Sequence, residues 1–75
     1  MEERIRQIMA TVFEVGVNEI DENTTPETIE KWVSLKHMNL VIELENEFGI
    51  MFKEEEIIEL LSYRLICDAV RKRKK

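Results

Sequence analysis

The segment Trp32–Phe48, WVSLKHMNLVIELENEF, decides the fold of this chain. Apolar residues recur in it at helical spacing, so we expect a helix from Ser34 to Phe48 that Gly49 ends. One apolar group consists of Leu40, Val41, Leu44 and Phe48, and a second, offset group consists of Leu35, Met38 and Ile42. A helix with two apolar groups either lies at the centre of a bundle or uses its second group to contact a partner.

The stretch before this helix, Val15–Val33, shows no sustained apolar periodicity and contains the only proline, Pro26. Loops longer than roughly 12–15 residues are uncommon in compact domains and are often functional. Ser34 therefore stands where a long loop turns into a helix. Its hydroxyl can serve as an N-cap that accepts a backbone N–H, or as a reactive or covalently modified group. The residue types alone leave both roles open.

Two further segments flank the loop and the central helix. The first has the stripe of an amphipathic helix, with Gly16 as its predicted stop; the stripe consists of Ile5, Ile8, Met9, Val12 and Phe13. The segment KEEEIIELL after Phe52 predicts a short helix whose glutamates lie at its N-terminal end. Ser62 is the predicted N-cap of a last helix, whose apolar face consists of Tyr63, Ile66, Cys67 and Val70. We therefore expect an all-α, small four-helix bundle, with three main helices, a short third helix and one domain over residues 1–75.

Charge is distributed unevenly along the 75 residues. The last five residues, RKRKK, carry five of the 11 basic side chains, so the preceding body has 6 basic and 16 acidic residues and a net charge of about −10. An acidic body repels nucleic acid and suits basic protein partners. We expect residues 71–75 to form a frayed, solubilising tail; contact with phosphate or anionic lipid is the alternative.

Several classes of function are disfavoured by the composition. No run of 18 apolar residues is present, so no membrane span is expected, and the charged start MEERIRQ argues against a secretory signal. Cys67 is the only cysteine and His37 the only histidine, which excludes an internal disulfide and a zinc pattern and favours a cytoplasmic protein. A Ser34–His37 pair lacks the other parts of a hydrolase site, so the chain is not expected to be an enzyme. We expect His37 to be partly packed or partner-facing, and Trp32 and Cys67 to lie in the core.

Ser34, its long loop and the helix LKHMNLVIELENEFGI together resemble an acyl carrier protein, and the resemblance covers nearly the whole chain. It implies a four-helix bundle in which Ser34 receives 4'-phosphopantetheine from coenzyme A. Acyl groups are then held as thioesters on the thiol of that arm, in fatty-acid synthesis or in a specialised acyl or polyketide pathway. The implied partners are a phosphopantetheinyl transferase and enzymes that transfer or modify acyl groups. A monomer is expected.

The resemblance also implies a partner-contact surface around Ser34. Its expected members are Leu35, Lys36, Met38, Asn39, Ile42 and Glu45. The chain departs from the family pattern there, because Val33-Ser34-Leu35 replaces Asp-Ser-Leu, and Lys36 and Asn39 stand at places that are often acidic. The alternative is therefore a helical interaction module of the same fold that carries no arm. A self-associating bundle is a third possibility if Leu61 and Leu65 are exposed.

Overall fold

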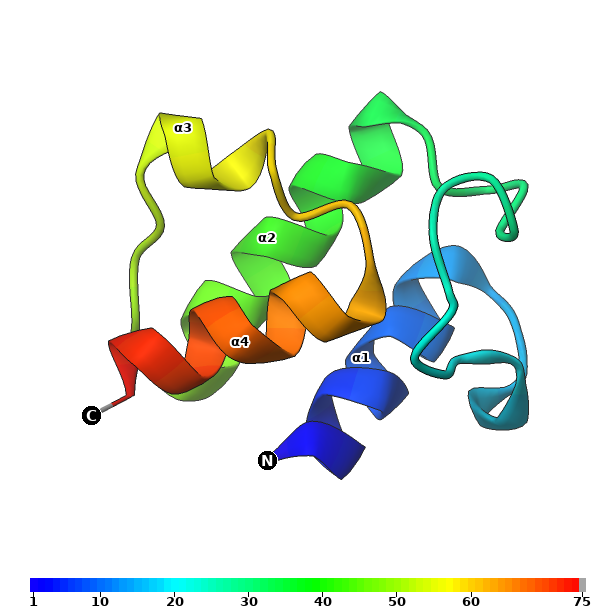
Figure 1. Ribbon diagram of the computed structural model, residues 1–75, viewed down its shortest axis with the longest axis horizontal. Helices are drawn as coiled ribbons and strands as arrows, with labels where there is room; N and C mark the ends of the chain where they lie inside the picture. Colours follow the sequence, from blue (N-terminus) through cyan, green and yellow to red (C-terminus); the bar gives the residue numbers. More distant parts are fainter. Residues whose placement is uncertain (75) are drawn as a thin grey trace.

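The computed structural model describes residues 1–74, and every regular element in this part of the chain is helical. The elements are α1 (Glu2–Phe13), the 3₁₀ helix η1 (Val17–Glu19), α2 (Ser34–Phe48), α3 (Glu54–Ile57) and α4 (Tyr63–Arg73). The helices α1, α2 and α4 form the body, and the one-turn helix α3 lies apart from α1, on the other side of α2 and α4 (Figure 1). The predicted all-α bundle and the bounds of its central helix are confirmed.

The core collects one apolar stripe from each long helix. The buried side chains of the helices are Ile5, Ile8, Met9, Ala10 and Phe13 of α1, Leu40, Val41 and Leu44 of α2, and Tyr63, Ile66, Cys67 and Val70 of α4. The segments between helices add Ile20, Ile29, Trp32, Phe52 and Leu60. The predicted core positions of Trp32 and Cys67 are therefore confirmed, whereas Phe48 is only half-buried. Burial of these stripes is the main driving force for the fold.

The helices α1 and α2 end with the same backbone motif. Gly49 adopts a left-handed conformation (φ 63°), and the N–H of Ile50 donates to the carbonyl of Glu45. Glu14 does the same after α1 (φ 60°), where the N–H of Val15 donates to the carbonyl of Ala10. This pattern is a Schellman C-cap, in which glycine is the usual left-handed residue. Gly49 is thus the predicted stop of α2, but the stop of α1 is Glu14.

Gly16, the predicted stop of α1, instead begins η1. Its N–H donates to the Glu19 carboxylate at 2.9 Å, and a Cβ at this position would meet the Asn18 Oδ1 at 2.7 Å. Gly16 itself has an extended backbone (φ −73°), and the flexible Asn18 side chain could move to admit a Cβ, so neither strain nor space requires glycine here. The sequence prediction that Gly16 stops α1 is wrong.

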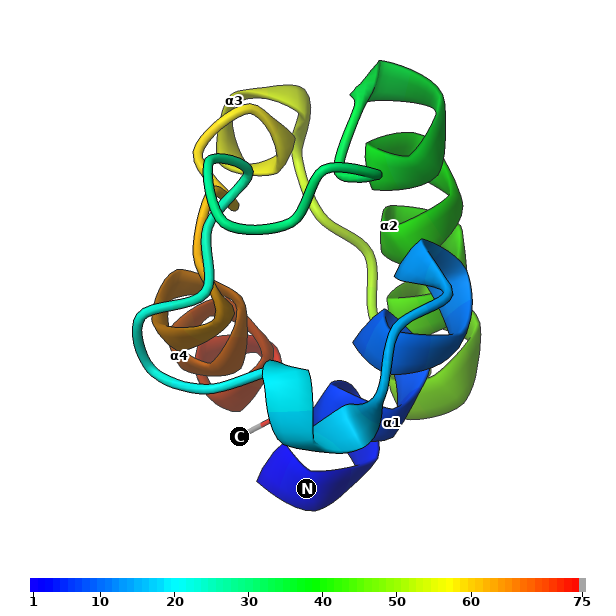
Figure 2. The same cartoon turned by 90° about the vertical axis from the view of Figure 1, so that its right-hand side faces the viewer.

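The long loop packs closely against the rest of the molecule, running from the end of α1 past α4 to the start of α2 (Figure 2). Thr24 is buried; its hydroxyl accepts the N–H of Asp21 at 2.8 Å, and its carbonyl accepts the N–H of Tyr63 at the start of α4. The loop also contributes Ile20, Ile29 and Trp32 to the core. This combination of hydrogen bonds and burial holds the loop in place, so the position of its last residue is defined.

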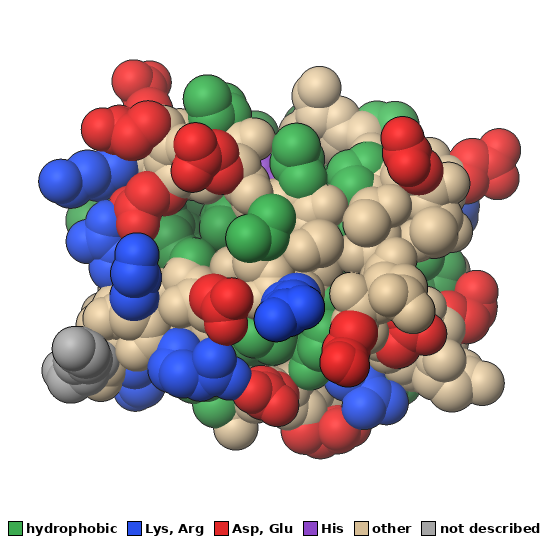
Figure 3. Space-filling view, in the orientation of Figure 1, with side chains coloured by type: hydrophobic (Ala, Val, Ile, Leu, Met, Phe, Trp, Pro, Cys, Tyr) green, Lys and Arg blue, Asp and Glu red, His purple; other side chains and the backbone are tan. Residues whose placement is uncertain are grey.

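The basic C-terminal segment differs from the predicted frayed tail. α4 continues to Arg73, Arg71 pairs with Glu2 and Asp68, and Arg73 pairs with Glu56 of α3. Basic side chains gather along the edge of the molecule near the C-terminus (Figure 3). Cations suit the last turn of a helix, where the carbonyl groups carry partial negative charge. Residues 71–73 thus belong to α4, and Lys75 lies outside the described residues.

Candidate functional site

Ser34 is the first residue of α2, and its side chain is exposed. The N-cap is Val33, in an extended conformation, and no side chain caps the helix. Ser34 is therefore not the N-cap of α2, so the first of the two roles expected for its hydroxyl is wrong. Because the N–H groups of a first helical turn have no partner within the helix, an uncapped start leaves donors next to the Ser34 hydroxyl.

An open hollow of about 380 Å³ lies beside Ser34. Apart from Ser34 its lining consists of Pro26, Trp32, Val33, His37, Met38, Ile57, Ile58 and Leu61. The walls therefore come from the end of the long loop, the first turns of α2, and α3 with the segment after it. Ile58 is 70% exposed and Val33 56% exposed, so apolar surface surrounds the serine on several sides.

His37 connects these walls through two hydrogen bonds. The indole N–H of Trp32 donates to the His37 Nδ1 at 2.9 Å, and the His37 Nε2 lies 2.8 Å from the carbonyl of Ile57. Trp32 is itself stacked on Phe13 of α1, with ring centroids 4.8 Å apart. The expectation that His37 is partly packed is confirmed. Its link between Trp32 and Ile57 was not expected, because Ile57 follows 20 residues later and acts through its backbone.

The three apolar residues of the predicted partner-contact surface are all on the outside of α2. Leu35 is 72% exposed, and Met38 and Ile42 are also exposed. The space-filling view shows hydrophobic side chains on the surface near α3 and the start of α2 (Figure 3). None of the three takes part in the core, so α2 carries an apolar strip that the bundle itself leaves uncovered.

Lys36, by contrast, forms an ion pair with Glu14 instead of lying along this strip. Its ammonium lies 2.9 Å from the Glu14 carboxylate, which also accepts a hydrogen bond from Lys31 at 2.7 Å. The hydrogen bonds from Lys31 and then Lys36 lower the pKa of Glu14 to about 2. One carboxylate thus joins the end of α1, the long loop and the first turn of α2.

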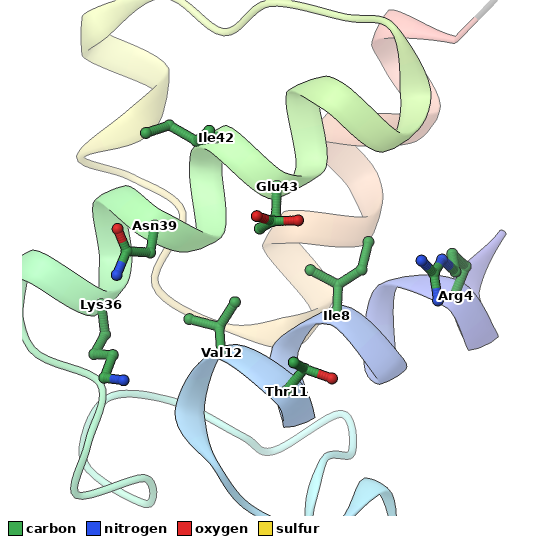
Figure 4. Close-up of a pocket in the computed structure, with 8 residues that line it drawn as sticks. All are labelled: Arg4, Ile8, Thr11, Val12, Lys36, Asn39, Ile42 and Glu43. Carbon is green, nitrogen blue, oxygen red and sulfur yellow. The ribbon is translucent and has the colours of Figure 1, made fainter.

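Glu45 and Asn39 occupy different surroundings. The Glu45 carboxylate accepts the N–H of Phe52 at 2.9 Å, which holds the segment that leads into α3. Asn39 is exposed and lines a second hollow, of about 400 Å³, between α1 and α2. Lys36 and Arg4 lie toward opposite ends of that hollow, with Val12 of α1 between them (Figure 4). Of the polar members of the predicted surface, only Asn39 therefore has no hydrogen bond to another part of residues 1–74.

Residues 1–74 give little evidence for metal binding or for thiol chemistry. The structure brings together no group of three or more histidine, cysteine, aspartate or glutamate side chains that could hold a metal ion. Cys67 is buried, and burial raises the pKa of its thiol, so this group is unsuited to act as a nucleophile. Among these residues no helix has the length and apolar character needed to cross a membrane.

Comparisons with known proteins point to one fold. A solution NMR structure of the holo acyl carrier protein from Geobacter metallireducens matches with a TM-score of 0.85 and 29% sequence identity, over 96% of this chain and 83% of that chain. No protein-family model and no curated protein matches the sequence. The fold match agrees with the resemblance that the Ser34 region shows in the sequence. The chain therefore has the fold of an acyl carrier protein, resembles that family over nearly its whole length, and is supported in an acyl carrier role.

Proposed function

We propose that Ser34 carries a 4'-phosphopantetheine arm and that the chain holds acyl groups on it as thioesters. The observation that carries this proposal is the placement of Ser34: an exposed hydroxyl, at the uncapped start of α2, beside an apolar hollow of about 380 Å³. The similar protein from Geobacter metallireducens is a holo acyl carrier protein. The chain is a carrier on this proposal, and the enzymes that act on the acyl group are its partners.

The start of α2 suits a phosphodiester. During modification the Ser34 hydroxyl oxygen would form a bond to the β-phosphorus of coenzyme A, the bond to 3',5'-ADP would break, and the hydroxyl proton would pass to a base of the transferase. The negative charge of the new phosphodiester would lie at the positive end of the α2 dipole, near N–H groups that no side chain caps. The residues present therefore fit the group.

The partner surface of this proposal is mainly apolar. Leu35, Met38 and Ile42 form an exposed strip on α2 that starts next to Ser34, whereas Lys36 and Glu45 are engaged within the molecule. The transferase and the acyl-handling enzymes would therefore contact α2 through these apolar side chains, with Asn39 at the edge. Carboxylates elsewhere on the acidic body would speed the approach of basic partners without entering that contact.

Intact-mass measurement tests the attachment. Incubation of the apo chain with coenzyme A and a broad-specificity phosphopantetheinyl transferase should add one phosphopantetheinyl group. Ser34→Ala should abolish the addition, and Ser62→Ala, which changes the only other serine, should leave it. If several transferases modify neither the wild-type chain nor Val33→Asp, which restores the Asp-Ser-Leu pattern of the family, the attachment proposal is overturned.

Val33 favours a second candidate, an interaction module with the same fold and no arm. Its apolar side chain is exposed immediately before Ser34, in place of the family's aspartate, and extends the apolar surface of the hollow. Chain isolated from its native host decides between the two candidates. A mass that includes the arm supports the carrier, whereas a uniformly unmodified population that binds a protein partner supports the module.

A further inference from the structure

We propose that His37 is a positioning residue for Ser34, acting through a hydrogen-bonded clip that opens when its imidazole is protonated. The clip consists of Trp32, His37 and the carbonyl of Ile57. As a role for the same serine this rests on the proposed function, although the clip itself can be observed without it.

The partners of His37 assign its tautomer. The indole nitrogen of Trp32 can only donate, so the His37 Nδ1, 2.9 Å away, must accept. In a neutral imidazole the proton then resides on Nε2, which donates to the carbonyl of Ile57 at 2.8 Å. Both ring nitrogens are thus used by the neutral form.

The bond from Trp32 to His37 closes a ring of six residues around Ser34. Trp32 precedes the serine by two positions and His37 follows it by three. The ring is fixed on one side by the stacking of Trp32 on Phe13, and on the other by the bond to Ile57. Since no side chain caps α2, the loop–helix junction is held by this clip and by the pairing of Glu14 with Lys31 and Lys36. Of these two restraints, only the clip includes a histidine, so a change in the clip should alter how firmly the serine is held.

Protonation breaks one side of the clip selectively. A proton on Nδ1 would place an N–H against the N–H of Trp32, and these two donors cannot bond to each other. The bond from Nε2 to Ile57 survives, because a protonated ring still donates there. The junction should therefore separate from α2 on the Trp32 side, while His37 stays attached to the segment at the end of α3.

No charged side chain lines the hollow that His37 faces. Charged groups on the surrounding elements include Lys31 in the loop and Lys36 on α2, both paired with Glu14, and Glu54, Glu55 and Glu56 on α3, the last paired with Arg73. Glu27 and Glu30 in the loop and Glu59 after α3 are further carboxylates on these segments. Histidine is the side chain whose charge ordinarily changes between about pH 5 and 8.

Nuclear magnetic resonance tests the clip directly on the apo chain, which has one tryptophan and one histidine. Between pH 7.5 and 5.5 the protection of the Trp32 indole N–H against hydrogen exchange should fall about tenfold. The backbone amide resonances of Ser34 and Leu35 should shift with the same midpoint as the His37 ring. His37→Gln, which does not titrate in this range, should abolish both responses. Trp32→Phe, which retains an aromatic ring on Phe13 but has no N–H, should abolish the shift of the Ser34 and Leu35 amides.

Modification kinetics provide the functional readout. With a broad-specificity transferase, kcat/KM of the wild-type chain relative to His37→Gln should fall about threefold from pH 7.5 to 5.5; the ratio removes the pH dependence of the transferase itself. A constant indole protection across this range overturns the clip. A titrating clip with a constant kcat/KM ratio, or with unmoved Ser34 amides, overturns the positioning role. If no modification occurs at any pH, the proposed function fails, and the resonances still decide the clip and its effect on Ser34.

Discussion

The two halves of α2 use their side chains in opposite ways. In the second half, Leu44 is fully buried, Glu45 accepts the N–H of Phe52, and Glu47 pairs with Arg4 before Gly49 ends the helix. In the first half, Ser34 has no capping bond, and Leu35 and Met38 are exposed. The end of α2 thus fixes the helix in the bundle, and its start leaves a hydroxyl and apolar surface for other molecules, while buried Leu40 and exposed Ile42 lie between these two regions.

This difference teaches where to look for function in a small domain. A 75-residue chain buries only a small apolar core. Exposed apolar side chains beside a reactive group therefore indicate a surface that contacts other molecules. Leu35 directly follows Ser34, Met38 lines the hollow beside it, and both are exposed; Ile42 continues this exposed strip farther along α2. Substitutions along α2 and at its partners should separate the residues that hold the helix in the bundle from those that are left exposed.

Leu44→Ala should destabilise the fold most. The side chain is fully buried, so its truncation should lower the free energy of unfolding by about 3 kcal/mol through lost burial and a residual cavity. Ile42→Ala, on the exposed side of the same helix, should change it by less than about 0.5 kcal/mol. Urea denaturation followed by circular dichroism measures both. Equal losses for the two variants would contradict the assignment of buried and exposed sides.

Gly49→Ala should reduce stability by about 1 kcal/mol. At φ 63° an L side chain is strained, although a Cβ there would meet no atom within 4 Å. Gly49→Asn is the matched control, because asparagine tolerates the left-handed region and should lose less. Thermal unfolding of the three chains compares them. A Gly49→Ala variant as stable as wild type would show that the Schellman cap is unimportant for α2.

Val33→Asp should stabilise the chain by about 1 kcal/mol, an increase of roughly 4–8 °C in Tm for a domain of this size. Val33 is exposed and extended, as an N-cap residue should be, and an aspartate there would accept a first-turn N–H and place its charge at the positive end of the helix. Val33→Asn separates the capping bond from the charge. No gain from either variant would indicate that the start of α2 is already satisfied.

Glu14→Gln should give the smallest effect, visible as a pH dependence. The hydrogen bonds from Lys31 and Lys36 lower the pKa of Glu14 from 4.5 to about 2. A lowered carboxylate pKa contributes stability that is present above pH 4.5 and lost as the pH falls toward 2. The difference in Tm between wild type and Glu14→Gln should therefore be present at pH 7 and vanish near pH 2. A difference that persists unchanged in acid would exclude the two ion pairs as its source.

Much of the fold was predictable because it depends on local pattern. Helical spacing placed α2 at Ser34–Phe48, and the stripes of α1 and α4 identified most of the core. Ser62 was predicted as the N-cap of α4, and its hydroxyl accepts the N–H of Leu65 at 3.0 Å. These features involve neighbours within a few positions, so the residue types suffice to indicate them.

The surroundings of the serine were less predictable, because they depend on distant partners. Lys36 was expected on the contact surface but pairs with Glu14, 22 positions earlier, and Glu45 bonds to the N–H of Phe52. The end of α1 was also mispredicted: Glu14 is the left-handed residue there, whereas the sequence indicated Gly16. The side chain of Glu14 pairs with two lysines, Lys31 and Lys36. No local rule assigns such pairs.

The helices, their core stripes and the position of Ser34 between a long loop and α2 follow from local pattern, since spacing and turn residues act locally. The packing of distant segments sets how that serine is surrounded. It brought Trp32, His37 and the carbonyl of Ile57 together, and it left Leu35, Met38 and Ile42 outside the core. The physical reason is that hydrogen bonds and burial between segments depend on how the helices pack, and periodicity along one helix does not specify that packing.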